Sequence, residues 1–266
     1  MNEFSRRSLL RSGLATGGLG VAALVPALGA CGGTSQSAVP VAQTGTATQT
    51  TAPPTSPTGT PTAEKLTPAQ AWSRLAQGNR TWAAGKRTCP QESAQRRQEV
   101  AAAQNPFAVV VSCMDSRLPP ETVFDQGVGA LFVVRTGAQT IDDLVKGSIE
   151  YGPVEHDTPL IVVMGHQRCG AVKATVESLE HDHPLPKHLN AIVESIKPAY
   201  EQAHAKGGDV LDQTIRAQTL RTVATLAADP ALSSKVGKGT LGLVAAYYSL
   251  DSGQVSVLQT IGFKPS

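Results

Sequence analysis

Two short motifs in the sequence contain cysteine and histidine at spacings that could hold a metal ion. Residues 113–117 read Cys-Met-Asp-Ser-Arg, and residues 165–170 read Gly-His-Gln-Arg-Cys-Gly. Two thiolates and an imidazole form a Cys₂His donor set, which suits zinc. A structural zinc site closes its fourth position with another Cys or His, and these motifs supply only three such ligands. Cys113, His166 and Cys169 therefore predict a zinc site whose fourth position is open for water, as catalysis requires.

The first motif also places a carboxylate beside a guanidinium. Asp115 and Arg117 are two residues apart, so in an extended or turning segment both side chains can face the same way. Such a pair holds the carboxylate ionised and orients it through bidentate hydrogen bonds. Asp115 could then accept a hydrogen bond from a metal-bound water, or it could itself become the fourth metal ligand and block the site.

Simpler interpretations of these residues remain open at this stage. A lone Asp-x-Arg is usually a surface ion pair, and Cys113 and Cys169 could instead form a disulfide. The two motifs together, each directly after a predicted strand, favour a metal site.

The elements that position these motifs alternate along the chain. Apolar runs predict strands at residues 107–112, 131–134, 160–164, 241–248 and 255–259, the last at an edge of the sheet. The first three runs are continuously apolar, which favours burial on both faces. Helices are predicted at residues 142–154, 171–180, 189–205 and 212–228, with an earlier one between Thr67-Pro68 and Gly85. The alternation predicts an α/β fold with a mainly parallel central β-sheet flanked by helices.

Composition and net charge limit the possible kinds of function further. Hydrophobic residues make up 41% of the chain, enough for a buried core. The formal net charge of +2 comes entirely from three arginines and one glutamate within the first thirty residues. The neutral remainder gives no reason to expect nucleic acid as a partner.

The first thirty residues have the pattern of an export signal. Paired arginines, Arg6 and Arg7, precede a weakly apolar, glycine-rich run at residues 14–28 that is too short and interrupted to span a membrane comfortably. The pattern resembles a twin-arginine signal. Residues 28–31, Leu-Gly-Ala-Cys, resemble a lipobox, in which residues 1–30 are removed and Cys31 is acylated. The alternative is an ordinary cleaved signal with a chance cysteine.

A low-complexity segment follows the predicted lipidation site. Residues 32–63 contain no charged or aromatic residue and are rich in Thr, Pro, Ser, Ala, Gly and Gln. Such a segment buries too little apolar surface to offset the entropy of ordering. We therefore expect residues 31–63 to be a flexible stalk and residues 64–266 to be the folded domain. The protein would be exported and lipid-anchored to the outer face of the cell membrane.

Over residues 69–258 the chain resembles the β-class carbonic anhydrases, whose signature is Cys-x-Asp-Ser-Arg followed by Gly-His-x-x-Cys-Gly. The resemblance implies that Cys113, His166 and Cys169 bind Zn²⁺ and that Asp115 and Arg117 form a catalytic dyad. It implies a lyase that reversibly hydrates carbon dioxide to bicarbonate and a proton by a zinc-hydroxide mechanism.

Further positions resemble the plant-like branch of that family. By resemblance, Gln104 hydrogen-bonds bicarbonate, Phe132 and Tyr151 form an aromatic wall, and the backbone of Gly170 lies close to the substrate. In this branch the active site lies at a dimer interface and takes part of its pocket from the partner subunit. The resemblance therefore implies a homodimer or a larger homo-oligomer.

One segment departs from the family pattern and keeps alternatives open. The family often has Arg-Asn-x-Ala-Asn where residues 135–139 here read Arg-Thr-Gly-Ala-Gln, so Gly137 replaces a larger apolar residue that would line the pocket. Because of this change, a hydrolase of carbonyl sulfide or carbon disulfide on the same fold is an alternative function. A non-catalytic zinc-binding surface lipoprotein is disfavoured by Asp115 and Arg117, which a structural site does not need. A thiol-redox lipoprotein is disfavoured because the sequence has no Cys-x-x-Cys motif.

Overall fold

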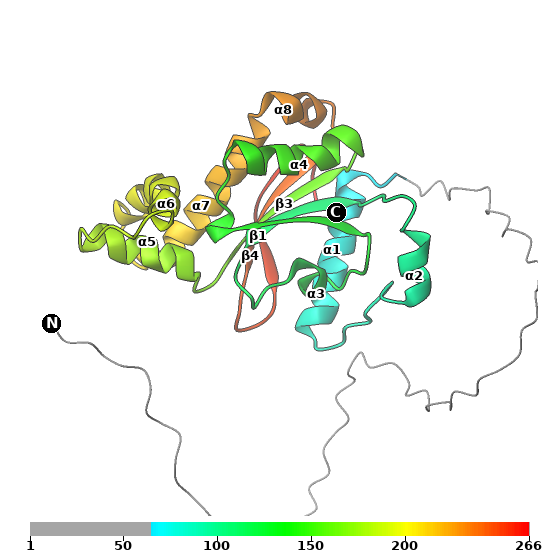
Figure 1. The fold of residues 1–266 in the computed structure, drawn as a ribbon, viewed down its shortest axis with the longest axis horizontal. Helices are drawn as coiled ribbons and strands as arrows, with labels where there is room; N and C mark the ends of the chain where they lie inside the picture. Colours follow the sequence, from blue (N-terminus) through cyan, green and yellow to red (C-terminus); the bar gives the residue numbers. More distant parts are fainter. Residues whose placement is uncertain (1–64, 266) are drawn as a thin grey trace, which may run out of the picture. The chain divides into compact units, whose positions relative to one another are not determined.

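The computed structural model describes residues 65–265, and these form a five-stranded sheet with helices on both faces (Figure 1). The predicted signal, Cys31 and the whole of the predicted stalk lie outside the described residues. The strands are β1 (Ala108–Cys113), β2 (Leu131–Thr136), β3 (Leu160–His166), β4 (Gly242–Tyr248) and β5 (Val255–Ile261). Their order in the sheet is β2-β1-β3-β4-β5; β5 is antiparallel to β4 and all other neighbours are parallel. The predicted fold class is confirmed.

Eight α-helices and one short 3₁₀ helix accompany the sheet within residues 65–265. They are α1 (Pro68–Ala83), α2 (Ala94–Glu99), α3 (Pro120–Val123), the 3₁₀ helix η1 (Gly137–Gln139), α4 (Asp143–Glu155), α5 (Gly170–Glu180), α6 (Leu189–His204), α7 (Val210–Ala227) and α8 (Pro230–Gly237). The first begins as its sequence predicts, because Thr67 and Gln70 form a reciprocal capping box and Pro68 occupies the first turn. None of these helices is both long enough and apolar enough to cross a membrane.

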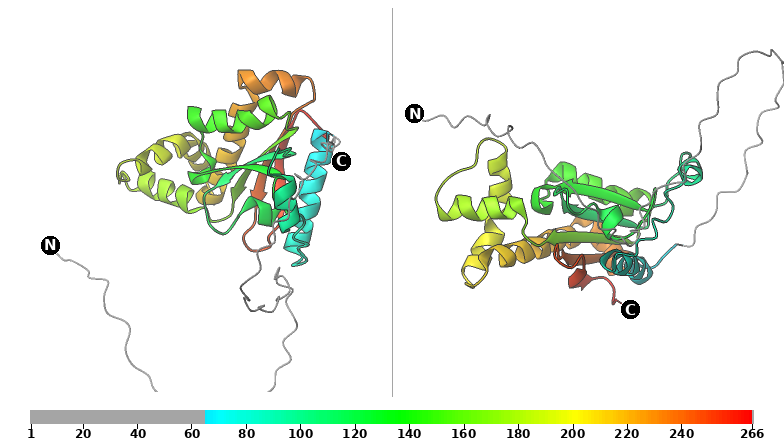
Figure 2. Two further views of the ribbon diagram at one scale, coloured as in Figure 1. Left: turned by 45° about the vertical axis from the view of Figure 1, so that its right-hand side comes forward. Right: turned by 90° about the horizontal axis from the view of Figure 1, so that it is seen from below.

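The sheet separates two hydrophobic cores, and Figure 2 shows the helices that lie on its two faces. On one face, α1 and α3 pack on the strands; on the other, α4, α7 and α8 do so. The first core includes Trp72, Leu75, Phe124, Val110 and Val162, all at most 6% exposed. Strands β1, β3 and β4 are buried along their whole length because helices cover both of their faces.

Strand β2 differs from the burial that its apolar run predicts. Every residue of β2 is half-buried, because β2 is an edge of the sheet and has no neighbour on its outer side among the described residues. An apolar strand left half-covered at an edge is a surface on which another chain can pack.

The connections of the strands diverge between β1 and β3. From β1 the chain passes to β2 on one side, and from β3 it passes towards β4 on the other side. The strand order therefore reverses between β1 and β3, and ligands in open α/β sheets bind at such a point, beyond the carboxyl ends of the strands. Both metal-site motifs begin there.

Candidate metal and catalytic site

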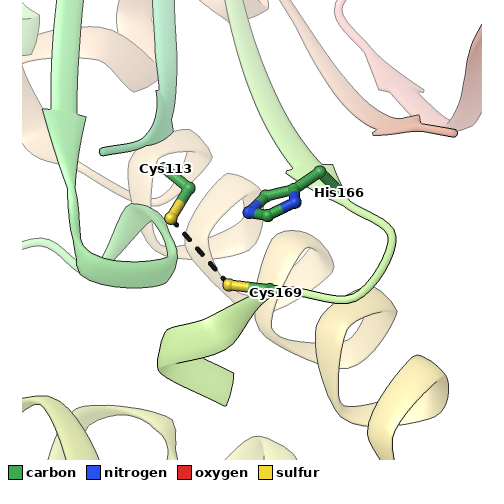
Figure 3. Close-up of side chains that lie close together, drawn as sticks. All are labelled: Cys113, His166 and Cys169. Atoms are coloured by element: carbon green, nitrogen blue, oxygen red, sulfur yellow. Dashed lines mark hydrogen bonds between the residues drawn. The ribbon is translucent and has the colours of Figure 1, made fainter. Parts of the chain in front are cut away.

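Three metal-binding side chains meet at the carboxyl ends of β1 and β3 (Figure 3). Cys113 is the last residue of β1, His166 is the last residue of β3, and Cys169 directly precedes α5. Their donor atoms all lie within 4.8 Å of one another, and the three residues are 3%, 0% and 1% exposed. The two sulfurs are 3.8 Å apart, well beyond the length of about 2.05 Å of a disulfide bond, so both thiols are free.

The donor set fits a zinc ion. The Nδ1 atom of His166 donates to the backbone carbonyl of Gln167 at 3.0 Å, because a carbonyl oxygen can only accept. This leaves the Nε2 lone pair of His166 buried without any hydrogen-bond partner. Two thiolates bound at about 2.3 Å to one tetrahedral ion would lie about 3.8 Å apart. The observed separation of the sulfurs and the unpaired nitrogen are what a metal between them would require.

A hydrogen bond joins the two sulfurs of the cluster. The hydrogen bond with Cys169 lowers the pKa of Cys113 to about 4 against the effect of burial, and the backbone N–H of Ala138 adds to the lowering. The same hydrogen bond, together with burial, raises the pKa of Cys169. A cation that displaced the proton of this hydrogen bond would face two thiolates, the form that binds zinc.

Asp115 and Arg117 form a bidentate pair at the edge of the cluster. The Arg117 guanidinium donates to both carboxylate oxygens of Asp115 at 2.9 and 2.6 Å, and its backbone N–H donates to Oδ1 at 3.0 Å. The hydrogen bonds from Arg117 lower the pKa of Asp115 to about 2, although partial burial opposes this. The Oδ2 atom of Asp115 lies 3.9 Å from the Nε2 atom of His166. An ionised acceptor is therefore held beside the metal donors.

Arg135 belongs to this site, although sequence reasoning gave it no role. Its side chain leaves the end of β2 and donates to the backbone carbonyls of Cys113, at 3.0 Å, and Asp115. It fixes the backbone that carries both a metal donor and the carboxylate of the pair. Two sequence signals were its place at the end of an apolar run and its match to the arginine that opens the family pattern at residues 135–139. In the structure it pairs in register with Ser112 of β1.

Asp251, which lies outside both motifs, holds the loop between His166 and Cys169. Gln167 donates to this carboxylate at 2.8 Å, and the guanidinium of Arg168 donates at 3.0 and 2.6 Å. Arg168 adopts a left-handed backbone conformation with a φ of 52°. Its carbonyl accepts from Arg117 at 3.3 Å, which links the two motifs.

Three of the four residues assigned to substrate by resemblance are not gathered around the donors of the same chain. Phe132 and Tyr151 contact each other edge to face, with ring centroids 5.7 Å apart. Phe132 pairs with Val109, four residues before Cys113, so it lies about 13 Å back along the sheet. Gln104 is exposed in the segment before β1. These three assignments stay predictions.

Gly170 does lie at the site. It is the first residue of α5, directly after Cys169, and it is exposed. A Cβ atom built on it would meet no atom within 4 Å, so open space adjoins its backbone. Its role towards substrate stays a prediction.

Packing explains why residue 137 is a glycine here, where the family often has a larger apolar residue. A Cβ atom at this position would come within 2.8 Å of the Cδ1 atom of Ile192, which lies on α6. Ile192 packs against the cluster that contains Cys113 and Ala138. An apolar side chain from α6 therefore fills space that a larger residue at 137 would take.

Comparison with known proteins gives close relatives over most of the chain. Residues 108–255 match a family model described as carbonic anhydrase. Carbonic anhydrase 2 of Mycobacterium tuberculosis is 39% identical over 197 residues, covering 73% of this chain and 95% of that protein. The carbonic anhydrase of Mycolicibacterium smegmatis is 38% identical over 196 residues, with the same coverage of 73% and 95%.

Solved structures show the same fold. A Coccomyxa β-carbonic anhydrase in complex with acetazolamide superposes with a TM-score of 0.57 at 24% identity, covering 71% of this chain and 87% of that one. A tetrameric β-carbonic anhydrase from Sordaria macrospora gives a TM-score of 0.57 at 19% identity, covering 70% and 96%.

Proposed function

The chain belongs to the β-carbonic anhydrase family, and we propose that it performs its reaction with a zinc ion held by Cys113, His166 and Cys169. The reaction is the reversible hydration of carbon dioxide to bicarbonate and a proton. The observation that carries the zinc proposal is the buried, unpaired Nε2 atom of His166 beside two sulfurs 3.8 Å apart.

When bound, zinc lowers the pKa of a coordinated water and so supplies a nucleophile at neutral pH, an effect for which carbonic anhydrases are the usual example. The protein's own residues prepare this chemistry. The hydrogen bond from His166 Nδ1 to a carbonyl fixes the ring so that Nε2 faces the sulfurs. Arg117 keeps Asp115 ionised and oriented, so its carboxylate accepts a hydrogen bond from a reacting water at the edge of the cluster.

The zinc proposal is tested by stopped-flow hydration of carbon dioxide on the full chain. Zinc is removed with a chelator and restored in steps, and zinc content is measured on each sample. We expect the rate to rise in proportion to zinc and to level off at about one ion per chain. A rate that is unchanged after complete removal of zinc would contradict the proposal.

We further propose that the enzyme is a homodimer or a larger homo-oligomer. Large apolar side chains are exposed along one side of α4, where Leu144 is 81%, Tyr151 47% and Val154 43% exposed. These side chains lie next to the half-covered edge strand β2, because Phe132 of β2 packs on Tyr151 of α4. Exposed apolar side chains on one side of a helix beside an apolar edge strand favour burial against a second copy, and a partner would also bring the aromatic pair to a second active site.

We also propose that the enzyme is exported and anchored by lipid at Cys31. The support is the order of paired arginines, apolar run and lipobox-like residues 28–31. In a host with lipoprotein processing, the full chain should incorporate labelled palmitate and sediment with membranes, and Cys31→Ser should do neither. Equal labelling and sedimentation of the variant would exclude Cys31 as the anchor.

A further inference from the structure

The turn that follows β2 is held in a backbone conformation that side-chain-bearing residues rarely adopt. Ala138 has a φ of 51° and Gln139 a φ of 47°, and both are buried, at 0% and 1% exposure. Non-glycine residues persist in this left-handed region only where their surroundings hold them. In this conformation the Ala138 N–H points at the sulfur of Cys113, 3.4 Å away.

Helix α7 supplies the groups that hold the turn. The side-chain amide of Gln139 donates to the hydroxyl of Thr219 at 3.0 Å. The hydroxyl of Thr222 donates to the backbone carbonyl of Gln139 at 3.3 Å. Both threonines are fully or almost fully buried, at 0% and 3% exposure. The longer side chain of glutamine, where the family often has asparagine, spans the gap from the turn to α7.

We propose that Gln139 and Thr219 are positioning residues for the metal centre, because they hold the Ala138 N–H as a hydrogen-bond donor to the Cys113 sulfur. This inference rests on the proposed zinc site. A donor to a metal-bound thiolate withdraws charge from the sulfur and leaves the metal a stronger Lewis acid. Two thiolates donate more charge than imidazoles would, so such a donor favours the acidity that carbon dioxide hydration needs.

The same helix offers a matched control. Thr214 is also 0% exposed, and its hydroxyl donates to the carbonyl of Val210 on its own helix at 2.7 Å. Thr219 makes the equivalent bond to Ile215 at 2.8 Å and additionally accepts from Gln139. Changing either threonine to valine removes one buried hydroxyl from α7, but only Thr219→Val removes the contact with the turn.

The test uses cobalt(II) in place of zinc on the full chain, because the sulfur-to-cobalt charge-transfer band reports directly on the thiolates. Loss of a donor to the sulfur raises the energy of its lone pair and shifts this band to longer wavelength. We expect this shift in Thr219→Val and Gln139→Met, with cobalt affinity weakened about tenfold. Thr219→Ser, which keeps the hydroxyl, should restore the wild-type band, and Thr214→Val should leave it in place.

The outcomes separate this inference from the zinc proposal. Band position is a property of the folded, loaded molecules, so partial unfolding of a variant lowers the intensity and leaves the wavelength unchanged. A wild-type band that is unmoved in Thr219→Val, or moved equally in Thr214→Val, would overturn the positioning role while the metal site stands. Wild-type protein that binds cobalt without a thiolate band would overturn the metal site, and the inference with it.

Discussion

At the scale of single residues, the site depends on how Asp115 is held. The Arg117 guanidinium donates hydrogen bonds to both oxygens of this carboxylate, and Arg135 donates one to the backbone carbonyl of Asp115. The pKa of Asp115, lowered to about 2 by the hydrogen bonds from Arg117, keeps the group ionised at every pH at which the enzyme would work. The carboxylate therefore acts as a permanent acceptor beside the metal donors.

Asp115→Asn should separate metal binding from catalysis. The amide keeps the shape of the side chain but loses its charge and one acceptor, so we expect hydration to fall about a hundredfold or more with zinc content unchanged. Asp157→Asn is the control, because Asp157 pairs with Lys65 and Lys235 on the surface and contacts no donor of the site. Equal activity of the two variants would remove Asp115 from the mechanism.

Asp125 is a second aspartate whose pKa is lowered by hydrogen bonds, and here the consequence is for the stability of the fold. It is 3% exposed and accepts hydrogen bonds from the hydroxyl and N–H of Thr88, the hydroxyl of Thr81 and the N–H of Cys89. Burial raises the pKa of Asp125, but these hydrogen bonds outweigh it and hold the pKa below its usual value. A carboxyl whose folded pKa is lowered stabilises the fold above its unfolded pKa, and this stabilisation disappears as the pH falls through the folded pKa.

Asp125→Asn should therefore be destabilising in a pH-dependent way. Asparagine tolerates the positive φ of 47° at this position, so the change isolates the charge and its hydrogen bonds. We expect a loss of about 1–3 kcal/mol in the free energy of unfolding at neutral pH, measured by urea denaturation. The difference from wild type should shrink below about pH 4, near the unfolded pKa of aspartate. A difference that stays constant with pH would show that the charge of Asp125 contributes nothing.

At the scale of elements, the sheet leaves no space between β1 and α4. A Cβ atom on Gly152 of α4 would come within 2.6 Å of Val109 and 3.1 Å of Phe132, whereas one on Gly147 of the same helix would meet nothing within 4 Å. Gly152→Ala should overpack this contact and cost about 1–3 kcal/mol. Gly147→Ala meets no atom of its own chain, so it should cost clearly less than Gly152→Ala. Urea denaturation in which the two changes cost the same would contradict this packing.

The sequence predicted elements well where apolar periodicity was strong. All five strands and the helices beginning near residues 68, 142, 171, 189 and 212 are confirmed, with bounds shifted by one or two residues. Helices α2, α3 and α8 were not predicted, because segments of six, four and eight residues carry too few apolar positions to show a period.

The site was predictable only in part. The types and spacing of Cys113, His166 and Cys169 predicted the cluster that the structure brings together. The turn at residues 137–139 could not be predicted, because alanine and glutamine give no signal for a left-handed backbone. The contacts of Gln139 with Thr219, 80 residues away, and of Arg168 with Asp251, 83 residues away, depend on packing that no local pattern reports.

At the scale of the whole molecule, the proposed oligomer is tested on α4. Leu144→Glu places a charge at the most exposed apolar side chain of that helix, so it should convert the assembly to monomers in light scattering. Leu189→Glu is the control, since Leu189 is 51% exposed at the start of α6. Because Phe132 and Tyr151 lie away from the donors of their own chain, the monomer should also hydrate carbon dioxide more slowly. If Leu144→Glu stays fully assembled, the interface does not include this side of α4.

The proposed enzyme depends on two sulfurs and one nitrogen that hold the same ion. X-ray absorption at the zinc edge of the zinc-loaded full chain measures this ligand set directly. We predict two sulfur scatterers at about 2.3 Å and two nitrogen or oxygen scatterers at about 2.0–2.1 Å, the latter including His166. A shell without sulfur would show that Cys113 and Cys169 do not bind the metal, and a shell of four sulfurs would show a closed structural site with no position for catalysis.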